Sequence, residues 1–455
     1  MYAIIFIQFG GTGLNYAEII NLIFSIISGL ISLLFLPFVV FLLVGIFTKK
    51  KYKKAKVKHK YGIVISARNE EKVIGNLIDS IRKTDYPQDK LDIFVVAHNC
   101  TDNTAEVCSK KGAKVYVYNN ENEKTKGYAL KYLFNQLKTD LKNGIREYDG
   151  YYIFDADNLV TADYFDKMND AFDAYGEKRI ITSMRNSKNF GSNLMSGMYG
   201  MFFMYGCRYI MRGRAKLGVS SRVYGTGQLI DSKILKNGWN YVTITEDFEL
   251  TADQVMEGNS IRYCDEAMLY DEQPTSFKVM WRQRVRWARG ALVVFGTRFF
   301  KIVKELFSRK QKSHNRISLY DLIANVVPIC IITICNYLLQ FILLLFCPLF
   351  GIALWPQILG LLTNLGWTML LGYIVLFLSA GLIFILERKR IPKMSFIKKI
   401  GVALFFPIFM ALQFPLDVVA LFSKNLTWKT IPHTDTTNVE MLTENEKTQE
   451  TKDEL

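Results

Sequence analysis

The sequence predicts an α/β domain with a mostly parallel sheet, joined to a bundle of membrane-spanning helices. Short apolar runs alternate with amphipathic helical patterns between residues 61 and 158, as expected for strands and the helices that connect parallel neighbours. Apolar stretches near the N-terminus and beyond residue 317 are long enough to cross a bilayer. The composition agrees, because 50% of the 455 residues are hydrophobic and the mean hydropathy is +0.11.

The N-terminal apolar run, from about residue 18 to 47, predicts an uncleaved span, because it is too long for the core of a signal peptide. A lysine-rich run from Lys49 to Lys60 follows it directly. Beside a span, such a run indicates the cytoplasmic side and contact with anionic membrane lipid. The net charge of +15 therefore does not indicate nucleic-acid binding, and no nucleic-acid recognition motif accompanies it.

Four short apolar strands are expected in the first half of the chain, at 61–66, 92–97, 114–118 and 151–154. Asn69 is placed to cap a helix after the first strand, and Thr101 or Asp102 can start the helix after the second, which Gly112 closes. Polar residues follow each strand. Because the carboxyl ends of parallel strands meet at one edge of a sheet, these polar residues are expected to share one ligand crevice.

The second half of the chain is less regular up to residue 276 and then becomes helical and apolar. Three further spans are expected, at about 322–348, 360–386 and 400–422, with a basic cytoplasmic turn at 388–399. Pro407, Pro415 and Asp417 predict that the last of these is kinked, re-entrant or interfacial rather than a simple crossing.

These observations divide the chain into five segments. They are an N-terminal anchor (1–48), a cytoplasmic α/β domain (49–276), interfacial helices (277–316), a C-terminal transmembrane region (317–423) and a polar acidic tail (424–455). The tail is expected to be loosely ordered. Its last four residues, Lys-Asp-Glu-Leu, are interpreted as a chance match to a retention signal.

Two carboxylates, Asp155 and Asp157, follow the fourth strand and offer the hard oxygen ligands that Mg²⁺ or Mn²⁺ prefers. Lys126, beside Gly127 at an expected helix start, can meet the phosphates that such an ion would hold. Each feature also has a simpler interpretation, since acidic turns and solvated loop lysines are common.

A second acidic pair, Glu246 and Asp247, lies at the expected start of a helix that runs to about Glu257. Such a pair can simply favour the helix dipole. Alternatively, Asp247 accepts the proton of an attacking hydroxyl while Glu246 helps to position it.

A helix over about 277–295 places Gln283, Arg286, Trp287 and Gly290 on one face. An indole, a guanidinium and an amide together suit a sugar that carries phosphate. The alternative is an amphipathic helix on the membrane surface that uses its arginines and Trp287 as anchors.

In this order along the chain, these motifs resemble the membrane-embedded processive glycosyltransferases of family 2, which include cellulose, hyaluronan, chitin and poly-N-acetylglucosamine synthases. Four signatures carry the resemblance: Ala67-Arg68-Asn69-Glu70, Asp155-Ala156-Asp157, Thr245-Glu246-Asp247 and Gln283-Arg284-Val285-Arg286-Trp287. They span roughly residues 61 to 290, and the flanking spans agree with the same family.

The resemblance implies a GT-A (Rossmann-like) catalytic domain and inverting transfer from a nucleotide sugar. Asp155 and Asp157 would hold the metal, and Asp247 would be the general base, assisted by Glu246. The donor site would comprise Ala67, Arg68, Glu70, His98, Lys126 and Asp155. The acceptor and diphosphate site would comprise Gln283, Arg284, Arg286, Trp287, Gly225, Thr226 and Gly227.

One position departs from the family pattern, because His98 stands where an aspartate usually contacts the base. Histidine can still donate or accept a hydrogen bond to a pyrimidine, so a uridine nucleotide is expected.

The main hypothesis is therefore a synthase in a bacterial plasma membrane that extends a β-linked polysaccharide and exports it through its own transmembrane channel, with its catalytic domain in the cytoplasm. Accessory export subunits are possible partners. One alternative is the transfer of a single sugar to a lipid. A second is a non-enzymatic, polysaccharide-binding subunit of an export complex.

Overall fold

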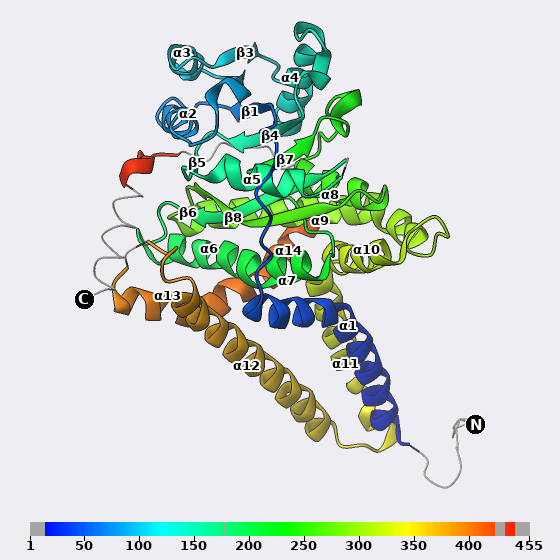
Figure 1. Cartoon of the computed structure of the whole chain (residues 1–455). Helices are drawn as coiled ribbons and strands as arrows, with labels where there is room; N and C mark the ends of the chain where they lie inside the picture. The colour runs from blue at the N-terminus through cyan, green and yellow to red at the C-terminus, as the bar shows by residue number, and fades with distance from the viewer. Residues whose placement is uncertain (1–13, 177, 393, 424–432, 442–455) are drawn as a thin grey trace.

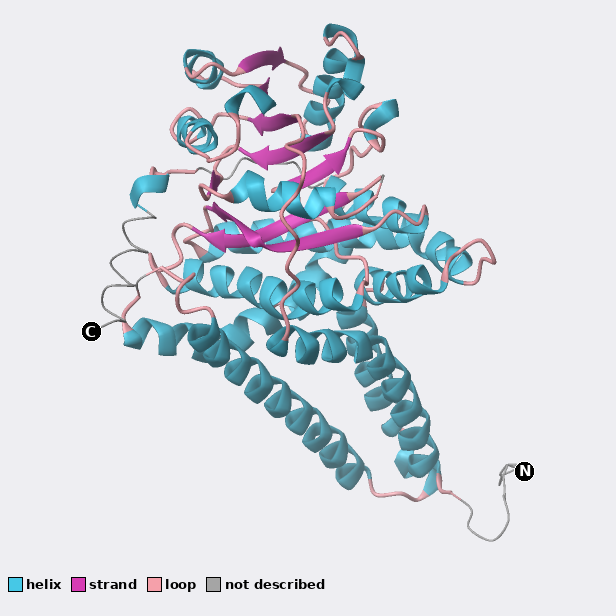
Figure 2. Cartoon of the chain, viewed as in Figure 1, coloured by secondary structure: helices cyan, strands magenta, loops and turns pink. Residues whose placement is uncertain are grey.

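The protein is a wedge of helices beneath an α/β domain (Figure 1). The computed structural model describes residues 14–176, 178–392, 394–423 and 433–441. The Lys-Asp-Glu-Leu terminus and the first residues of the predicted tail lie outside these ranges. The predicted fold class is confirmed: a central sheet is flanked by helices, and long apolar helices extend away from it (Figure 2).

The sheet has eight strands in the order β3-β2-β1-β4-β7-β6-β8-β5. The strands are β1 (Tyr61–Ala67), β2 (Leu91–His98), β3 (Lys114–Tyr118), β4 (Gly150–Asp155), β5 (Leu159–Val160), β6 (Ile180–Ser187), β7 (Gln228–Asp231) and β8 (Ile261–Asp271). All four strands predicted in the first half of the chain are present, with ends within one residue of the expected ones.

The two halves of the sheet differ in direction. Strands β3, β2, β1 and β4 are parallel neighbours, with Ile63 opposite Ile93 and Tyr152. Strand β7 then pairs antiparallel with both β4 and β6, and β5 pairs antiparallel with β8, whereas β6 and β8 are parallel. The irregular segment after residue 179 therefore completes the same sheet. The carboxyl ends of β1, β2 and β4 face one edge, where a ligand crevice is expected.

Helices cover both faces of the sheet. In the α/β domain they are α2 (Ile74–Arg82), α3 (Thr104–Lys110), α4 (Lys126–Asp140), α5 (Tyr164–Asp173), α6 (Leu194–Tyr205), α7 (Arg212–Leu217) and α8 (Glu246–Met256), with a π-helix η3 (Gly206–Met211) between α6 and α7. One buried core joins the sheet to α2, α3 and α5, and a second joins it to α4, α8 and the long helix α9 (Phe277–Leu306). The sheet is thereby shielded on both sides, as parallel strands require.

The start of α2 corrects one sequence prediction. Asn69 does not cap this helix, which begins at Ile74 after Val73. Asn69 instead has a positive φ of 57°, and its side-chain oxygen accepts a hydrogen bond from the Thr101 backbone N–H at 2.7 Å. It therefore ties the loop after β1 to the loop after β2. Gly112 does close α3, as predicted, with a φ of 77°.

Within the part of the chain that the structure describes, three helical segments are long and apolar enough to cross a membrane: α1 (Tyr16–Phe47), α12 (Leu354–Leu386) and the pair α13 (Phe396–Ala411) and α14 (Gln413–Phe422). A fourth candidate is the pair α10 (Ser313–Val326) and α11 (Ile329–Leu344). This pair corrects the continuous span predicted at 322–348, because its helices are bent by 60°. Pro328 stands between them, where a proline cannot supply the backbone donor that a continuous helix needs.

Proline also shapes the other spans. Pro37 lies inside α1, and Figure 1 shows α1 bending so that its last part runs beneath α7. Pro407 lies inside α13, which runs across the base of the α/β domain beneath α6 and at a steep angle to α12 (Figure 1). Leu412, a single turn residue, separates α13 from α14, and the two helices together form one candidate span of 27 residues. The kinked, re-entrant or interfacial path indicated by Pro407, Pro415 and Asp417 stays a prediction.

Polar side chains in the spans join helices to one another. Asn336 of α11 donates to the Ser28 hydroxyl of α1 at 3.2 Å, and Gln340 donates to Asn21 at 3.1 Å. Amides at membrane depth need such partners. These contacts therefore link α11 to α1.

Candidate active site

A cavity of about 210 Å³ opens at the carboxyl ends of β1, β2 and β4. Much of its lining comes from the loops that follow these strands, the first turns of α4 and α8, and one face of α9. The predicted site residues that it brings together are Arg68, Glu70, His98, Lys126, Asp155, Asp157, Gly225, Glu246, Asp247, Gln283, Arg286 and Trp287. Residues far apart in the sequence therefore share one crevice.

Lys126 lies at the centre of the cavity, as the first residue of α4. Its ammonium pairs with the Asp155 carboxylate and donates to the Gly225 carbonyl at 2.7 Å. Burial alone would lower the pKa of Lys126, but the carboxylates of Asp155 and Glu246 raise it above the usual value. The side chain is therefore a fixed positive charge. At a helix N-terminus such a charge favours a phosphate.

Gly127 explains how this lysine comes so close to the rest of the site. A Cβ at this position would lie 2.3 Å from the Tyr241 carbonyl oxygen and 2.7 Å from the Cα of Val242. Only glycine lets the start of α4 approach that backbone.

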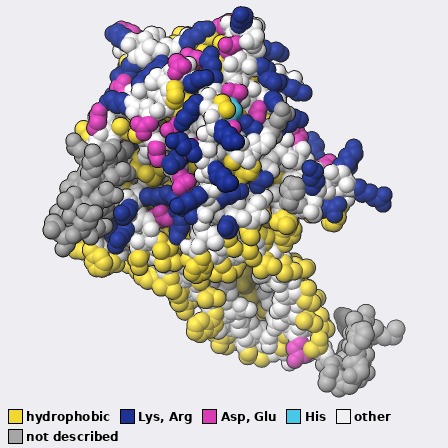
Figure 3. All heavy atoms as spheres, in the orientation of Figure 1, with side chains coloured by type: hydrophobic (Ala, Val, Ile, Leu, Met, Phe, Trp, Pro, Cys, Tyr) yellow, Lys and Arg dark blue, Asp and Glu magenta, His cyan; other side chains and the backbone are white. Residues whose placement is uncertain are grey.

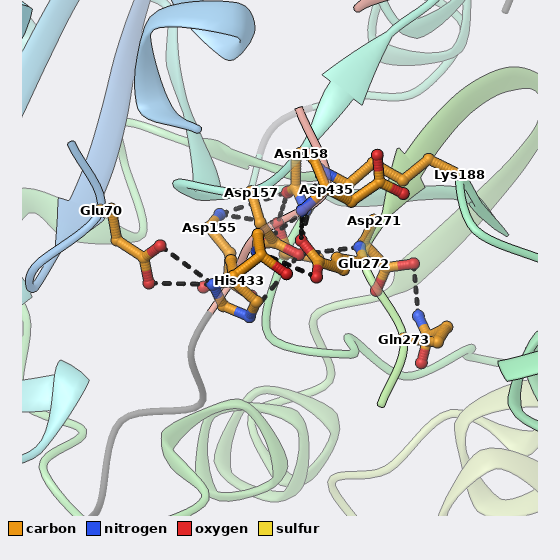
Figure 4. A network of polar contacts seen from close by, with 12 residues as sticks. Glu70, Asp155, Asp157, Asn158, Lys188, Asp271, Glu272, Gln273, His433 and Asp435 are labelled. Carbon is orange, nitrogen blue, oxygen red and sulfur yellow. Dashed lines mark hydrogen bonds and ion pairs between the residues drawn. The ribbon is translucent and has the colours of Figure 1, made fainter. Parts of the chain in front are cut away.

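Asp157 lies deeper in the cavity than Asp155 and faces a histidine (Figure 4). One of its carboxylate oxygens accepts the Glu272 backbone N–H at 2.9 Å and lies 4.0 Å from Nε2 of His433. The other ring nitrogen of His433 lies 2.9 Å from Glu70. Burial would lower the pKa of His433, yet Asp157 and Glu70 raise it to about 10. At neutral pH His433 is therefore a cation held between two carboxylates.

This donor set can be tested against the divalent ion that the fold implies. Among the residues that the structure describes, no three Asp, Glu, His or Cys side chains are arranged to hold a metal ion by themselves. Asp155 and Asp157 nevertheless lie on the same wall of the cavity. One or two carboxylates are the usual protein share of a Mg²⁺ site, whose other ligands are waters and substrate phosphates. The residues fit an ion that arrives with a diphosphate.

The second acidic pair begins α8. Glu246 and Asp247 both line the cavity, and an Asp247 side-chain oxygen accepts the Phe248 backbone N–H at 2.9 Å. Burial, together with the neighbouring Asp247 carboxylate, raises the pKa of Glu246 to about 7, and burial likewise raises the pKa of Asp247. Such a pair can take up a proton near neutral pH, which a general base requires.

Gly225 connects this pair to Lys126. It has a φ of 80°, and its carbonyl accepts the Lys126 hydrogen bond. A Cβ at this position would lie 3.4 Å from the Asp247 carboxylate. The glycine therefore adopts a left-handed conformation beside Asp247 that other residues rarely take.

Helix α9 presents the predicted face to the cavity. Gln283, Arg286 and Trp287 line it, and Arg286 donates to the Ile244 carbonyl at 3.1 Å. The Trp287 ring meets Tyr199 and Phe203 of α6 edge to face, at 6.2 and 6.3 Å. Tyr199 also donates to the Gln283 amide at 2.7 Å. Gly290, one turn further on, lets the helix approach Thr245, because a Cβ there would lie 2.2 Å from the Thr245 methyl carbon.

Arg284 corrects the prediction, since it does not line the cavity. It points from another face of α9, donates to the Phe409 carbonyl at 2.7 Å and donates to Gln413 at 3.0 Å. These partners lie where α13 meets α14, so Arg284 supplies a donor to a broken span. A residue directly after Gln283 is turned about 100° around a helix, which removes it from the face of Gln283 and Trp287.

Three other predicted residues support the cavity from behind. Ala67 is buried at the end of β1. The Thr226 hydroxyl accepts the Asp155 backbone N–H at 3.0 Å, and thereby fixes the turn that carries the metal motif. Gly227 has a φ of 65°, and a Cβ there would lie 1.9 Å from Leu269. None of the three is among the residues that line the cavity.

His98 lines the donor side of the cavity and is held rigidly. Its ring stacks on Tyr118 with centroids 5.4 Å apart, and its Nε2 lies 2.7 Å from the Glu123 carbonyl oxygen. Burial lowers the pKa of His98. The ring is thus neutral at physiological pH and offers a flat surface beside the cavity.

Comparisons with known proteins assign the chain to a family. The family model described as "Glycosyltransferase like family 2" matches residues 59–290, just over half of the chain. The chain is a family 2 glycosyltransferase. It is thus an enzyme, and the resemblance seen in its motifs is confirmed at the level of the family.

Curated relatives of this glycosyltransferase have different products. The chain is 28% identical over 264 residues to the probable glycosyltransferase YdaM of Bacillus subtilis, covering 54% of this chain and 59% of that protein. It is 25% identical to the β-monoglucosyldiacylglycerol synthase of a Nostoc species, covering 50% and 48%. It is 26% identical to the poly-β-1,6-N-acetyl-D-glucosamine synthase of Staphylococcus aureus, covering 53% and 57%. The chain thus spans about half the length of these relatives.

A solved structure extends the similarity of fold. The mannosyltransferase PcManGT from Pyrobaculum calidifontis, in complex with GDP-Man and Mn²⁺, superposes with a TM-score of 0.52. The match covers 90% of this chain and all of that one, at 14% sequence identity. The glycosyltransferase fold therefore accounts for most of the described chain.

Sequence reasoning missed several residues of this site. His433 comes from the predicted acidic tail, which was expected to be loosely ordered. Residues 433–441 instead lie against the α/β domain: the Thr434 and Asp435 backbone N–H groups each donate to Glu272 at 3.1 Å, and Lys188 donates to the Asp435 carbonyl at 2.9 Å (Figure 4). No periodicity marks such a segment, and only its one histidine distinguishes it.

Arg185 is a second residue that was missed. It lies on β6, lines the cavity, pairs with Asp271 and stacks its guanidinium on Phe203 at 3.9 Å. Its signal in the sequence was a lone arginine in an apolar strand, where a charge is rarely placed without a partner.

Proposed function

We propose that this enzyme transfers a sugar from a uridine diphosphate sugar to the end of a growing β-linked polysaccharide. One observation carries the proposal. A single cavity joins a phosphate-binding group (Lys126, Asp155 and Asp157) to a carboxyl base (Asp247) and an aromatic platform (Trp287). Donor, base and acceptor are the three parts that one transfer step needs.

The donor would lie along the strand ends. Lys126 and the first turn of α4 meet the diphosphate, and the stacked ring of His98 lies beside the base. Asp155 and Asp157 would hold Mg²⁺ or Mn²⁺, which when bound neutralises the charge that develops on the departing diphosphate. The Mn²⁺ in the complex of the mannosyltransferase PcManGT supports this assignment.

The transfer would be a single displacement. Asp247 accepts the proton of the attacking acceptor hydroxyl, whose oxygen forms a bond to the anomeric carbon of the donor sugar. The bond from that carbon to the diphosphate breaks, and the nucleoside diphosphate leaves with the electron pair. Since attack and departure occur on opposite faces, the anomeric configuration inverts. No covalent enzyme intermediate is needed.

The terminal sugar of the acceptor would bind against α9. Trp287 offers its indole to the C–H face of the terminal sugar, while Gln283 and Arg286 lie beside it. The wall formed by Tyr199 and Phe203 holds the indole in place. The spans next to α9 would place this end of the site at the membrane, on the cytoplasmic side of a bacterial plasma membrane, where the lysine-rich run follows α1.

The purified enzyme in detergent, given Mg²⁺ or Mn²⁺ and a panel of nucleotide sugars, tests this function. The proposal predicts long products from one uridine diphosphate sugar, resolved by gel filtration and linkage analysis. Release of free sugar alone, with no polymer and no glycolipid, would contradict transfer to an acceptor.

A second candidate is the transfer of one sugar to a lipid. The observation in its favour is the divergence of α12 from α1 and α11, which leaves the spans splayed rather than closed into a tube (Figure 1). The β-monoglucosyldiacylglycerol synthase of Nostoc supports it as well. The same assay separates the two functions, because a monoglycosylated lipid would partition into organic solvent and a polysaccharide would not.

A further inference from the structure

A second cavity, of about 370 Å³, lies where the apolar helices α1 and α12 meet the α/β domain. Its walls come from Lys49, which follows α1, from Arg208 and Arg212 at the junction of η3 and α7, and from residues 385–390 at the end of α12. It shares no residue with the nucleotide-sugar cavity. It has therefore no part in the transfer chemistry described above.

The cavity carries an excess of positive charge. Its cationic side chains are Lys49, Arg208, Arg212, Arg388, Lys389 and Arg390, and its one carboxylate is Glu387. Two more carboxylates, Asp265 and Glu266, pair with these cations from the domain side. Six of the nine residues that line the cavity are therefore cationic and one is acidic. An additional anion would bring the cluster closer to neutrality.

The back of the cavity is prearranged. Arg208 and Arg212 are only 7% and 5% exposed, and both reach the Glu387 carboxylate, at 3.0 and 2.9 Å. Arg208 also donates to the Ile46 carbonyl in the last turn of α1, at 3.0 Å. These contacts fix the guanidinium groups and join the ends of α1 and α12.

The mouth of the cavity is more open. Lys49, Arg388 and Lys389 are exposed, and the Lys49 ammonium lies 3.6 and 3.7 Å from Asp265 and Glu266, beyond a normal hydrogen bond. The apolar side chains of Ile385 and Leu386 line the same cavity and are 69% and 41% exposed. One wall is thus apolar and faces the spans, and the other is cationic and faces the domain.

The position of the cavity matches the headgroup layer of a bilayer. Figure 3 shows Lys and Arg side chains gathered just above the apolar surface of the helices. A cation at this depth meets lipid phosphates, and an apolar residue one turn below meets the first carbons of the acyl chains.

We propose that this cavity binds the phosphate headgroup of an anionic glycerophospholipid and thereby clamps the ends of α1 and α12 together. The apolar wall of Ile385 and Leu386 favours a lipid over a free phosphate ion, which would gain nothing from it. The proposal needs α1 and α12 to cross a bilayer, but it does not depend on which sugar or acceptor the enzyme uses.

Native mass spectrometry of the full chain in detergent tests the proposal, with equal amounts of phosphatidylglycerol and phosphatidylcholine added. The wild type is expected to retain one phosphatidylglycerol with at least a tenfold preference. In the variant Lys49→Gln/Arg388→Gln/Lys389→Gln the preference should fall to below about twofold, because each cation near an anionic headgroup contributes about fivefold. These residues form the mouth, so the buried arginines that support the fold are left intact.

Two control variants sharpen the result. Arg309→Gln/Lys310→Gln/Lys312→Gln removes the same charge from exposed positions outside the cavity, and it should keep the preference. The variant Lys49→Arg/Arg388→Lys/Lys389→Arg keeps the positive charge of the mouth. It should therefore also keep the preference for phosphatidylglycerol. If the triple glutamine variant aggregates, the single variant Lys389→Glu replaces it.

Three outcomes would overturn the proposal. The first is an unchanged preference in the variants of the mouth. The second is an equal loss in the Arg309, Lys310 and Lys312 control, which would attribute the effect to net charge. The third is displacement of the bound lipid by inorganic phosphate as readily as by short-chain phosphatidylglycerol, which would make the cavity a phosphate-ion site.

Discussion

The donor end and the acceptor end of the active-site cavity use carboxylates in opposite ways. At the donor end, burial alone would raise the pKa of Asp157, but the cations His433 and Lys188 hold it below its usual value. At the acceptor end, burial raises the pKa values of both Glu246 and Asp247. The first carboxylate is kept charged to attract a cation, while the second pair can gain a proton near neutral pH.

The two ends also differ in what holds them. The donor residues come mainly from loops after β1, β2 and β4 and from the segment that carries His433, with Lys126 supplied by the first turn of α4. The acceptor residues come from α8 and from α9, which α6 supports through Tyr199 and Phe203. Rigid helices suit a site that must hold the end of a long acceptor in place, whereas loops can close around a donor that enters and leaves in every cycle.

The largest expected effect comes from removing the base. Asp247→Asn should lower the rate of transfer by about 10²- to 10⁴-fold, because an amide cannot accept the proton of the attacking hydroxyl. The rate is measured at saturating donor and compared with donor affinity from calorimetry. The affinity should be nearly unchanged. A full rate in this variant would remove Asp247 from the role of base.

Asp157→Asn should weaken binding at the donor end of the cavity. We expect donor affinity in the presence of Mn²⁺ to fall by roughly 10- to 100-fold, the usual cost of losing an interaction with a charged group. Titration calorimetry with a uridine diphosphate sugar measures it. Asp163→Asn, at the start of α5 and outside the cavity, is the matched control and should bind normally. Equal affinity in the Asp157 variant and the wild type would contradict the metal assignment.

Trp287→Ala should weaken acceptor retention by about tenfold, since the aromatic face that covers the sugar is lost. The expected sign is a shorter product with little change in donor affinity, measured by gel filtration of the polymer. Trp287→Phe should retain much of the length, because it keeps a ring against Tyr199. Products of normal length from the alanine variant would place the acceptor elsewhere.

The pH dependence separates Glu246 from Asp247. The base works only when ionised, so the rate should fall as the pH drops through the raised pKa of Asp247. In Glu246→Gln the neighbouring negative charge is gone, and Asp247 should ionise at lower pH. The acid limb of the rate profile should then move to lower pH. A limb that stays in place or moves to higher pH would show that the two carboxyls are not coupled.

The smallest effect on catalysis is expected from Arg284, on another face of the helix that carries Arg286. Arg284→Met leaves the Phe409 carbonyl and Gln413 without their donor and should cost about 1–3 kcal/mol of stability. The melting temperature in detergent should fall while activity persists. Arg286→Met should lower the activity and leave the melting temperature in detergent nearly unchanged. If Arg284→Met lost activity but kept its full stability, Arg284 would belong to the active site after all.

Local patterns predicted most of this site because the fold places strand ends together. Asp155, Lys126 and His98 could be found since each follows or begins an element that the apolar periodicity marks. The face of α9 could be found from helical spacing alone. Arg284 was assigned to the site because it lies inside a motif, although helical spacing already turns it away from the face of Gln283 and Trp287. No local pattern marks the return of the distant polar segment that carries His433.

The membrane region was less predictable for a physical reason. Apolar composition identifies spans by length, but it does not say where a helix bends. Pro328 stands at the break in one predicted span, and α1, which contains Pro37, is bent (Figure 1). Polar side chains, among them Asn336 and Arg284, bond to partners in other helices, and such partners cannot be identified from one segment of sequence.

The central claim is that base and leaving group act on opposite faces of one donor sugar, and the configuration of the product tests it most directly. An α-linked uridine diphosphate sugar is supplied, and the newly formed linkage is examined by the one-bond carbon–hydrogen coupling at its anomeric position. The account predicts a β linkage. An α linkage would require retention, and would contradict a single displacement with Asp247 as the base.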